Sequence, residues 1–118
     1  MVDIETFRKM ALSFPEAIEL PHFEKTSFRV NKKIFATLDI KNALACLMLT
    51  EQDQYVFSAT DRAVIYPVPN KWGLKGATFV ELKLVKKIIL KNSMKLAYNK
   101  CVKKPVSKKL PSSNNSKK

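Results

Sequence analysis

The chain has few of the residues that common catalytic and cofactor-binding motifs need. It has two glycines, Gly73 and Gly76, so neither a Gly-rich dinucleotide fingerprint nor a phosphate-binding P-loop can be written. It has one histidine, His22, and its two cysteines, Cys46 and Cys101, form no CxxC or Cys/His pattern. Catalytic triads, acid–base pairs and metal-activated waters each need such side chains brought together. The sequence therefore favours a protein without enzymatic activity, cofactor or metal.

Long apolar runs are also absent. The longest, Ala43 to Leu49, is too short to cross a bilayer. Charged residues, among them Asp3, Glu5 and Arg8, stand where a signal peptide needs an apolar run. The cysteines lie within apolar stretches, which is typical of reduced, buried thiols in cytosolic proteins. We therefore expect a cytoplasmic protein without a membrane segment.

Acidic residues are nearly missing from the C-terminal half. Residues 62–118 hold 15 Lys or Arg and one carboxylate, Glu81, whereas residues 1–61 hold seven bases and nine acids. Concentrated positive charge attracts polyanions by releasing their counterions, so nucleic acid is the first expected partner, ahead of an anionic membrane surface. Removing the six lysines of 103–118 from the net charge of +12 leaves +6. The part expected to fold is therefore basic in its own right.

Hydrophobic periodicity predicts one domain of helices and strands over residues 1–104. Asp3 is a candidate N-cap for a first helix, which Pro15 ends. Thr50 and Asp53 resemble a capping box that opens a short helix through Ala59. The other predicted elements are strands at 26–30 and 34–40 joined by a hairpin tip at 31–33, a strand at 43–49 buried on both faces, strands at 63–68 and 77–84 separated by a long turn, and a last helix at 85–102.

The end of the chain has a different composition. Residues 105–118 consist almost entirely of Lys, Ser, Asn and Pro and show no apolar period. Such a segment has too little apolar surface to offset the entropy of ordering. We expect a disordered basic tail.

Three groups of basic residues form the candidate binding surface. Lysines contact phosphates without reading sequence, and an exposed aromatic ring among them can stack on an unpaired base. Two basic hairpins would act as wings, with Tyr98 beside the lysines of the last helix. The candidates are Lys32 and Lys33 at the hairpin tip, Lys71, Trp72 and Lys75 in the long turn, and Lys87, Lys91 and Lys95 on the last helix.

Three segments resemble a known family. They are LPHFEKTSFRVNKKIFAT at 20–37, YPVPNKWG at 66–73 followed by TFVEL at 78–82, and the Ala97–Tyr98 pair. In this order and spacing they resemble the MmcQ/YjbR-like family of small bacterial proteins over about residues 3–104. One departure is Ala77, where members often carry a tryptophan.

The resemblance implies an α+β domain of the CyaY-like kind, with an antiparallel sheet and the first and last helices packed on one face. It also implies a double-wing arrangement suggestive of DNA binding, in a family with no established activity. The leading hypothesis is therefore a non-enzymatic protein that binds nucleic acid, most simply DNA, without sequence preference.

Two alternatives stay open. A protein-interaction or small-ligand module predicts a concave apolar pocket or an exposed apolar patch near Trp72 and His22. An unrecognised enzyme predicts a pocket in which His22 lies at hydrogen-bond distance from Glu16, Glu19 or Glu24.

Overall fold

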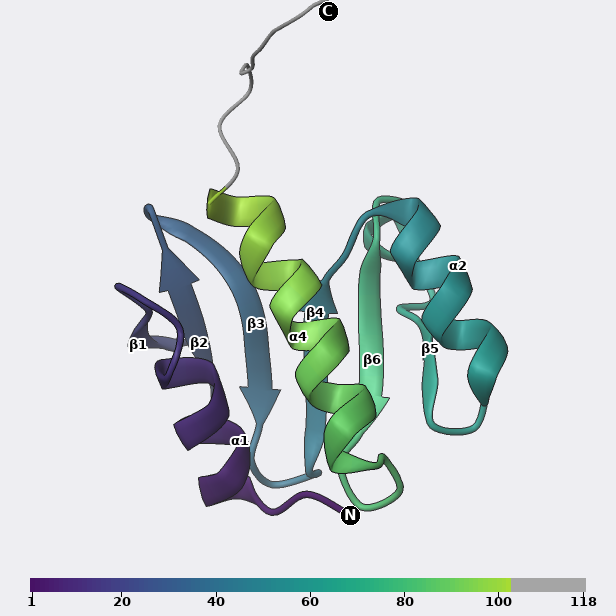
Figure 1. The fold of residues 1–118 in the computed structure, drawn as a ribbon, viewed down its shortest axis with the longest axis horizontal. Helices are drawn as coiled ribbons and strands as arrows, with labels where there is room; N and C mark the ends of the chain where they lie inside the picture. Colours follow the sequence, from purple (N-terminus) through teal and green to yellow (C-terminus); the bar gives the residue numbers. More distant parts are fainter. Residues whose placement is uncertain (103–118) are drawn as a thin grey trace, which may run out of the picture.

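A six-stranded antiparallel sheet forms the centre of the molecule (Figure 1). The structure is a computed structural model and describes residues 1–102. The strands lie in the order β1-β2-β3-β4-β6-β5, so β5 pairs with the outer edge of β6. Their bounds are β1 Ile18–His22, β2 Lys25–Val30, β3 Lys33–Asp39, β4 Leu44–Met48, β5 Ile65–Pro67 and β6 Ala77–Glu81.

The first and last helices cover one face of this sheet, as the family resemblance implied. Helix α1 spans Ile4–Leu12 and packs the ring of Phe7 edge-on against Phe28 of β2, with 5.6 Å between ring centroids. Helix α4, Lys87–Val102, crosses β3 and β4 (Figure 1). The apolar side chains between these helices and the sheet are buried and form one core. The α+β fold with both terminal helices on one face is confirmed.

Tyr98 belongs to that core, and its expected place beside the lysines as an exposed ring is wrong. Its ring stacks on Phe14, with 4.7 Å between centroids, and meets Phe35 edge-on. Its hydroxyl donates a 2.7 Å hydrogen bond to the carbonyl oxygen of Pro15. The residue joins α4 to the end of α1 because ring and hydroxyl both find partners there.

Both predicted helix caps form. The Asp3 carboxylate accepts a 2.7 Å hydrogen bond from the amide of Thr6, and the Thr50 hydroxyl accepts a 3.1 Å bond from the amide of Asp53. The second cap opens helix α2, Glu51–Thr60, which packs beside β5 at the edge of the sheet. Among the described residues, no helix is long and apolar enough to cross a membrane.

Three features differ from the sequence prediction. Strand β1 lies in a segment where the sequence analysis predicted no strand, and the long turn before β6 contains a short helix, α3, Lys71–Leu74. Strand β4 is not buried on both faces, since Leu44, Cys46 and Met48 are only half-buried. Within the described residues, this face of the sheet carries no helix except the short α3. The expected tail at 105–118 lies outside the described residues.

The turn that connects α3 to β6 requires glycine. Gly76 has a φ of +111°, and a Cβ atom there would lie 1.8 Å from the carbonyl oxygen of Leu49. The peptide of Gly76 also accepts a 3.1 Å hydrogen bond from the Leu49 amide. This close approach joins the α3 turn to the end of β4.

We predict that Gly76→Ala destabilises the protein by about 1–3 kcal/mol, because an L side chain at this φ is strained and has no room. Urea unfolding measures the change. Asn99→Ala, on the exposed side of α4, is the matched control and should shift stability by at most about 0.5 kcal/mol. Equal stability of the two variants would contradict the argument.

Candidate nucleic-acid interface

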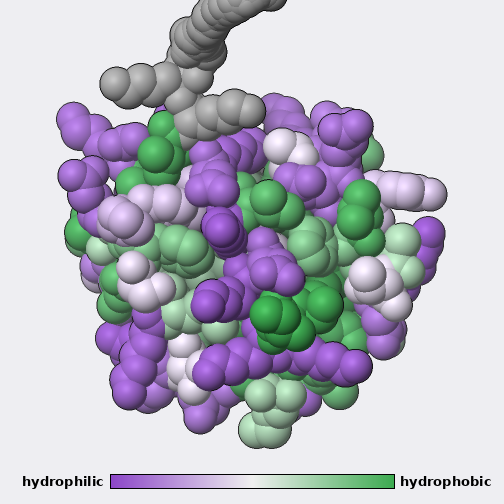
Figure 2. Space-filling model, viewed as in Figure 1, coloured by the Kyte–Doolittle hydropathy of each residue, from purple (hydrophilic) through white to green (hydrophobic). Residues whose placement is uncertain are grey.

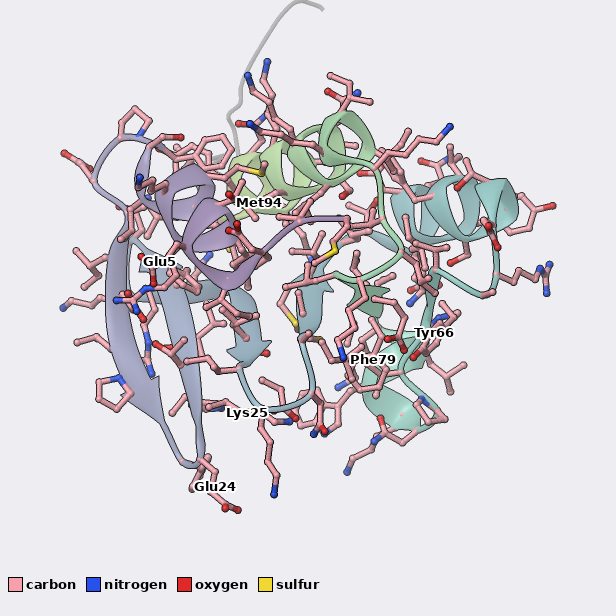
Figure 3. The ribbon with its side chains drawn as sticks, turned by 90° about the horizontal axis from the view of Figure 1, so that it is seen from below. Glu5, Glu24, Lys25, Tyr66, Phe79 and Met94 are labelled. Atoms are coloured by element: carbon pink, nitrogen blue, oxygen red, sulfur yellow. The ribbon has the colours of Figure 1, made fainter. Side chains whose placement is uncertain are left out.

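The structure divides the sequence-predicted basic residues between the two sides of the sheet. Lys87, Lys91 and Lys95 lie on α4, which packs on the helix-covered face. Lys71, Trp72 and Lys75 lie in and just after α3, and Figure 3 shows that short turn on the side of the sheet opposite α4. A straight duplex docked on one side therefore contacts one set and leaves the other free.

Three lysines converge on a hollow between α1 and α4. Lys87 and Lys91 come from the first turns of α4, and Lys9 comes from α1 on the opposite wall. Lys9 is not among the binding candidates that the sequence analysis named. We call this site the helix-layer hollow; its volume is about 460 Å³, and it is lined by Thr6, Lys9, Met10, Ser13, Lys87 and Lys91.

Helix geometry extends this basic surface along α4. Residues four apart in an α-helix are offset by only about 40° around the axis, so Lys95 follows Lys91 on the same side. Lys87, Lys91 and Lys95 are all exposed and span about 12 Å along the helix. Figure 2 shows hydrophilic side chains over much of this face and an apolar patch low on it.

Carboxylates do not pair with these lysines in ion pairs. Both ion pairs within residues 1–102 use Arg8, which lies 3.5 Å from Glu5 and 3.0 Å from Glu19. Asp3 is an acidic residue close to Lys9 and Lys87. The amide of Thr6 lowers the pKa of Asp3 most, and the charges of Lys9 and Lys87 lower it further. The helix-layer hollow therefore keeps an excess of positive charge.

Lys32 and Lys33 lie at the opposite end of α4 from Lys87. Asn31 and Lys32 form the two-residue turn between β2 and β3, both with positive φ, and Lys33 begins β3. The next residue, Ile34, accepts a 3.6 Å hydrogen bond from the Cys101 thiol near the end of α4. Because α4 has 16 residues, about 24 Å separates its two ends. This hairpin tip and the helix-layer hollow are thus separate parts of one side.

The uncovered side of the sheet holds a larger, mostly apolar groove. We call it the open-face groove; its volume is about 530 Å³. The lining residues come from five strands and α3 together with the adjoining Val68: His22, Lys25, Ile34, Thr37, Cys46, Met48, Val68, Trp72, Ala77 and Phe79. The unbroken apolar run of β4 was the sequence signal for this surface. Its alternate residues Cys46 and Met48 face away from the core and line the groove.

Two projecting elements wall the open-face groove. On one side the β1–β2 hairpin, with Glu24 at its tip, extends away from α4 (Figure 3). On the other side the wall is helix α3, which carries Trp72. Asn70 caps this helix by accepting a 2.8 Å hydrogen bond from the amide of Trp72. The wing opposite α3 is therefore the β1–β2 hairpin and not the Lys32–Lys33 tip, which lies at the other end of β2.

A buried glutamine holds α3 in place. The side-chain amide of Gln54, on α2, donates hydrogen bonds of 2.8 Å to the Gly73 carbonyl and 3.0 Å to the Ala77 carbonyl. It thereby links α2 to both ends of the α3–β6 connection. Trp72 points outward from this support and is 54% exposed, so it is not a core residue.

His22 lines the open-face groove without an acidic partner. Its ring lies edge-on to Phe23, with 4.9 Å between centroids, and it forms no hydrogen bond to Glu16, Glu19 or Glu24. Glu19 instead accepts from Thr26 at 2.8 Å and pairs with Arg8. Within residues 1–102, no group of three His, Cys, Asp or Glu side chains could hold a metal ion.

Tyr66 lies beyond Phe79 on the same side of the sheet. Its ring meets Phe79 edge-on, with 5.8 Å between centroids, and its hydroxyl donates a hydrogen bond to the carboxylate of Glu81. This hydrogen bond, together with burial and the negative charge of Glu81, raises the pKa of Tyr66 to about 12.

We predict that Glu81→Gln lowers the pKa of Tyr66 toward its ordinary value of 10.0, because an amide oxygen accepts the tyrosine hydrogen bond less strongly than a carboxylate and has no charge to repel a phenolate. Since the folded-state pKa is raised, the interaction stabilises the fold fully below about pH 10, and this contribution is lost as pH rises toward 12. NMR titration of the tyrosine ring signals measures the pKa. An unchanged Tyr66 titration in the variant would show that Glu81 is not its partner.

Comparisons with known proteins identify a shared fold. Neither the scan against protein-family models nor the search of curated proteins finds a match. A solved structure does match: the crystal structure of the Deinococcus radiodurans protein DR2400, a domain of the family model DUF419. The TM-score is 0.77 at 21% sequence identity, with 98% of this chain and 94% of that chain covered. DUF419 is the MmcQ/YjbR family, so the fold that the resemblance implied is confirmed.

Proposed function

We propose that this chain is a non-enzymatic protein of the MmcQ/YjbR kind that acts in the cytoplasm and binds duplex DNA through its lysines, without sequence preference. The fold likeness to the DUF419 domain supports the family assignment. The observation that carries the binding proposal is the convergence of Lys9, Lys87 and Lys91, from two helices far apart in sequence, on one hollow.

The physical basis is counterion release. Each lysine that neutralises a phosphate frees condensed cations from the duplex, and the affinity then falls as salt rises. Lys87, Lys91 and Lys95 form a row of ammonium groups along α4, and Lys9 adds a fourth from α1. Ammonium groups place a phosphate backbone without reading base edges, which explains the expected lack of sequence preference.

We predict that the double variant Lys87→Ala/Lys91→Ala reduces the slope of log affinity against log salt by about 2, roughly one for each lost phosphate contact. Binding of a fluorescent duplex at a series of salt concentrations measures the slope. The matched control is Lys71→Ala/Lys75→Ala, which removes the same charge from the opposite side of the sheet and should leave the duplex slope near that of the natural chain.

A further full-length variant, with the six lysines of 103–118 replaced by serine, separates the folded surface from the end of the chain. If that variant loses all duplex binding, or if Lys87→Ala/Lys91→Ala binds with an unchanged slope, the helix-layer hollow is not the DNA site.

The second candidate function is ligand binding without nucleic-acid contact. The observation in its favour is the open-face groove, which is apolar, concave and lined by both His22 and Trp72, as that alternative requires. This candidate predicts that the natural chain binds no duplex even at low salt.

A further inference from the structure

The open-face groove has an aromatic surface that the duplex proposal does not use. Trp72 is 54% exposed on one wall, and the half-buried ring of Phe79 lies on the floor. His22 stands on the opposite wall. Rings exposed in this way can stack on planar bases of any sequence, because every base has a π-face.

Positive charge accompanies these rings. The ammonium of Lys75 lies over the Trp72 ring, 5.7 Å from the centroid, and Lys71 precedes Trp72 in α3. Lys25 lies on the far wall, and its charge acts on both the Cys46 thiol and the Asp39 carboxyl. One wall of the groove therefore carries the ammonium group of Lys25, and the ammonium group of Lys75 lies beside Trp72 on the other wall.

Carboxylates are missing from the lining of the groove. Its ten lining residues include Lys25 and His22 but no Asp or Glu. An occupant with negative charge is therefore complementary to the site, and the mostly apolar floor suits a flat, weakly hydrated surface. The volume of about 530 Å³ is in the range of ordinary ligand sites and leaves space for a base with its sugar.

We propose that the open-face groove binds single-stranded nucleic acid, with an unpaired base stacked on Trp72 and the adjoining phosphates held by Lys71, Lys75 and Lys25. This inference rests on the proposed function, since it takes a nucleic acid as the partner, and it assigns a second site with a different form of that partner. A nucleotide carries a flat base and a phosphate one sugar apart, and α3 offers a ring and an ammonium at similarly close range.

The shape of the groove explains the preference for an unpaired base. In a duplex each base is stacked above and below and its edge faces a groove of the helix, so its π-face is not available to a side chain. The walls formed by the β1–β2 hairpin and α3 rise on either side of the floor (Figure 3). A single strand can lie between these walls with its bases turned inward.

The test uses Trp72, the single tryptophan of the chain, as its own reporter. A thymidylate single strand of roughly eight nucleotides, within the site sizes of known single-strand binders, is titrated into the full chain. We expect quenching of Trp72 emission that saturates. Anisotropy of a labelled strand then gives the affinity of Trp72→Ala, which we expect to be lower by about 5- to 150-fold, the range for loss of one stacked base. Trp72→Phe keeps a ring and should lose less.

The two charge variants form a crossed control. Lys71→Ala/Lys75→Ala should weaken binding of the single strand and leave duplex binding near that of the natural chain. Lys87→Ala/Lys91→Ala should do the reverse. Duplex binding by the first variant and a cooperative thermal transition by circular dichroism show that it is folded.

Three outcomes would overturn the inference. Duplex binding without quenching by the single strand would contradict the open-face site but not the proposed function. If the chain binds neither form of nucleic acid, both proposals are contradicted. Equal weakening of single-strand binding in the two charge variants would show that charge alone attracts the strand. Quenching by thymidine monophosphate at the same concentrations as by the strand would identify the occupant as a small molecule.

Discussion

The closure of the core by two helices on one face of the sheet is the constraint on which the rest of the structure depends. Phe7 from α1 meets Phe28 of β2, while Tyr98 from α4 and Phe14, which follows α1, meet Phe35 of β3. The two helices are therefore fixed to neighbouring strands. Within residues 1–102, α4 is the last element, and the other face carries only the short helix α3. The sheet therefore has one dry side and one side on which apolar residues remain accessible.

This asymmetry gives the molecule two surfaces of different chemistry. Within residues 1–102, the helix layer presents ammonium groups that are not held in ion pairs with carboxylates, a surface suited to a phosphate backbone. The open side presents rings, aliphatic side chains and a few lysines within a groove, a surface suited to a flat anionic partner. Gln54 and Gly76 fix the α3 turn to the rest of the fold. Gln54 joins the turn to α2, and Gly76 joins it to the end of β4.

Local sequence signals predicted much of the fold correctly. The N-caps Asp3 and Thr50, the period-two strands around the hairpin tip at 31–33 and the apolar arc of the last helix all reappear in the structure. Strand β1 was not predicted, because its residues, IELPH, include a proline and a charge and resemble a loop. The prediction that β4 is buried on both faces was wrong, because an apolar run does not show whether a helix packs on each face of the strand. Three-dimensional proximity was the least predictable property: Lys9 joins Lys87 and Lys91 only because α1 packs beside α4.

Mapping the duplex contacts by amide chemical shifts tests the central claim most directly. With a short duplex added to the full chain at low salt, the account predicts the largest shifts along one side of α4 and in the part of α1 that holds Lys9, with salt reversing them. Shifts confined to residues 103–118, or centred on the open-face groove, would contradict the assignment of the duplex site to the helix layer.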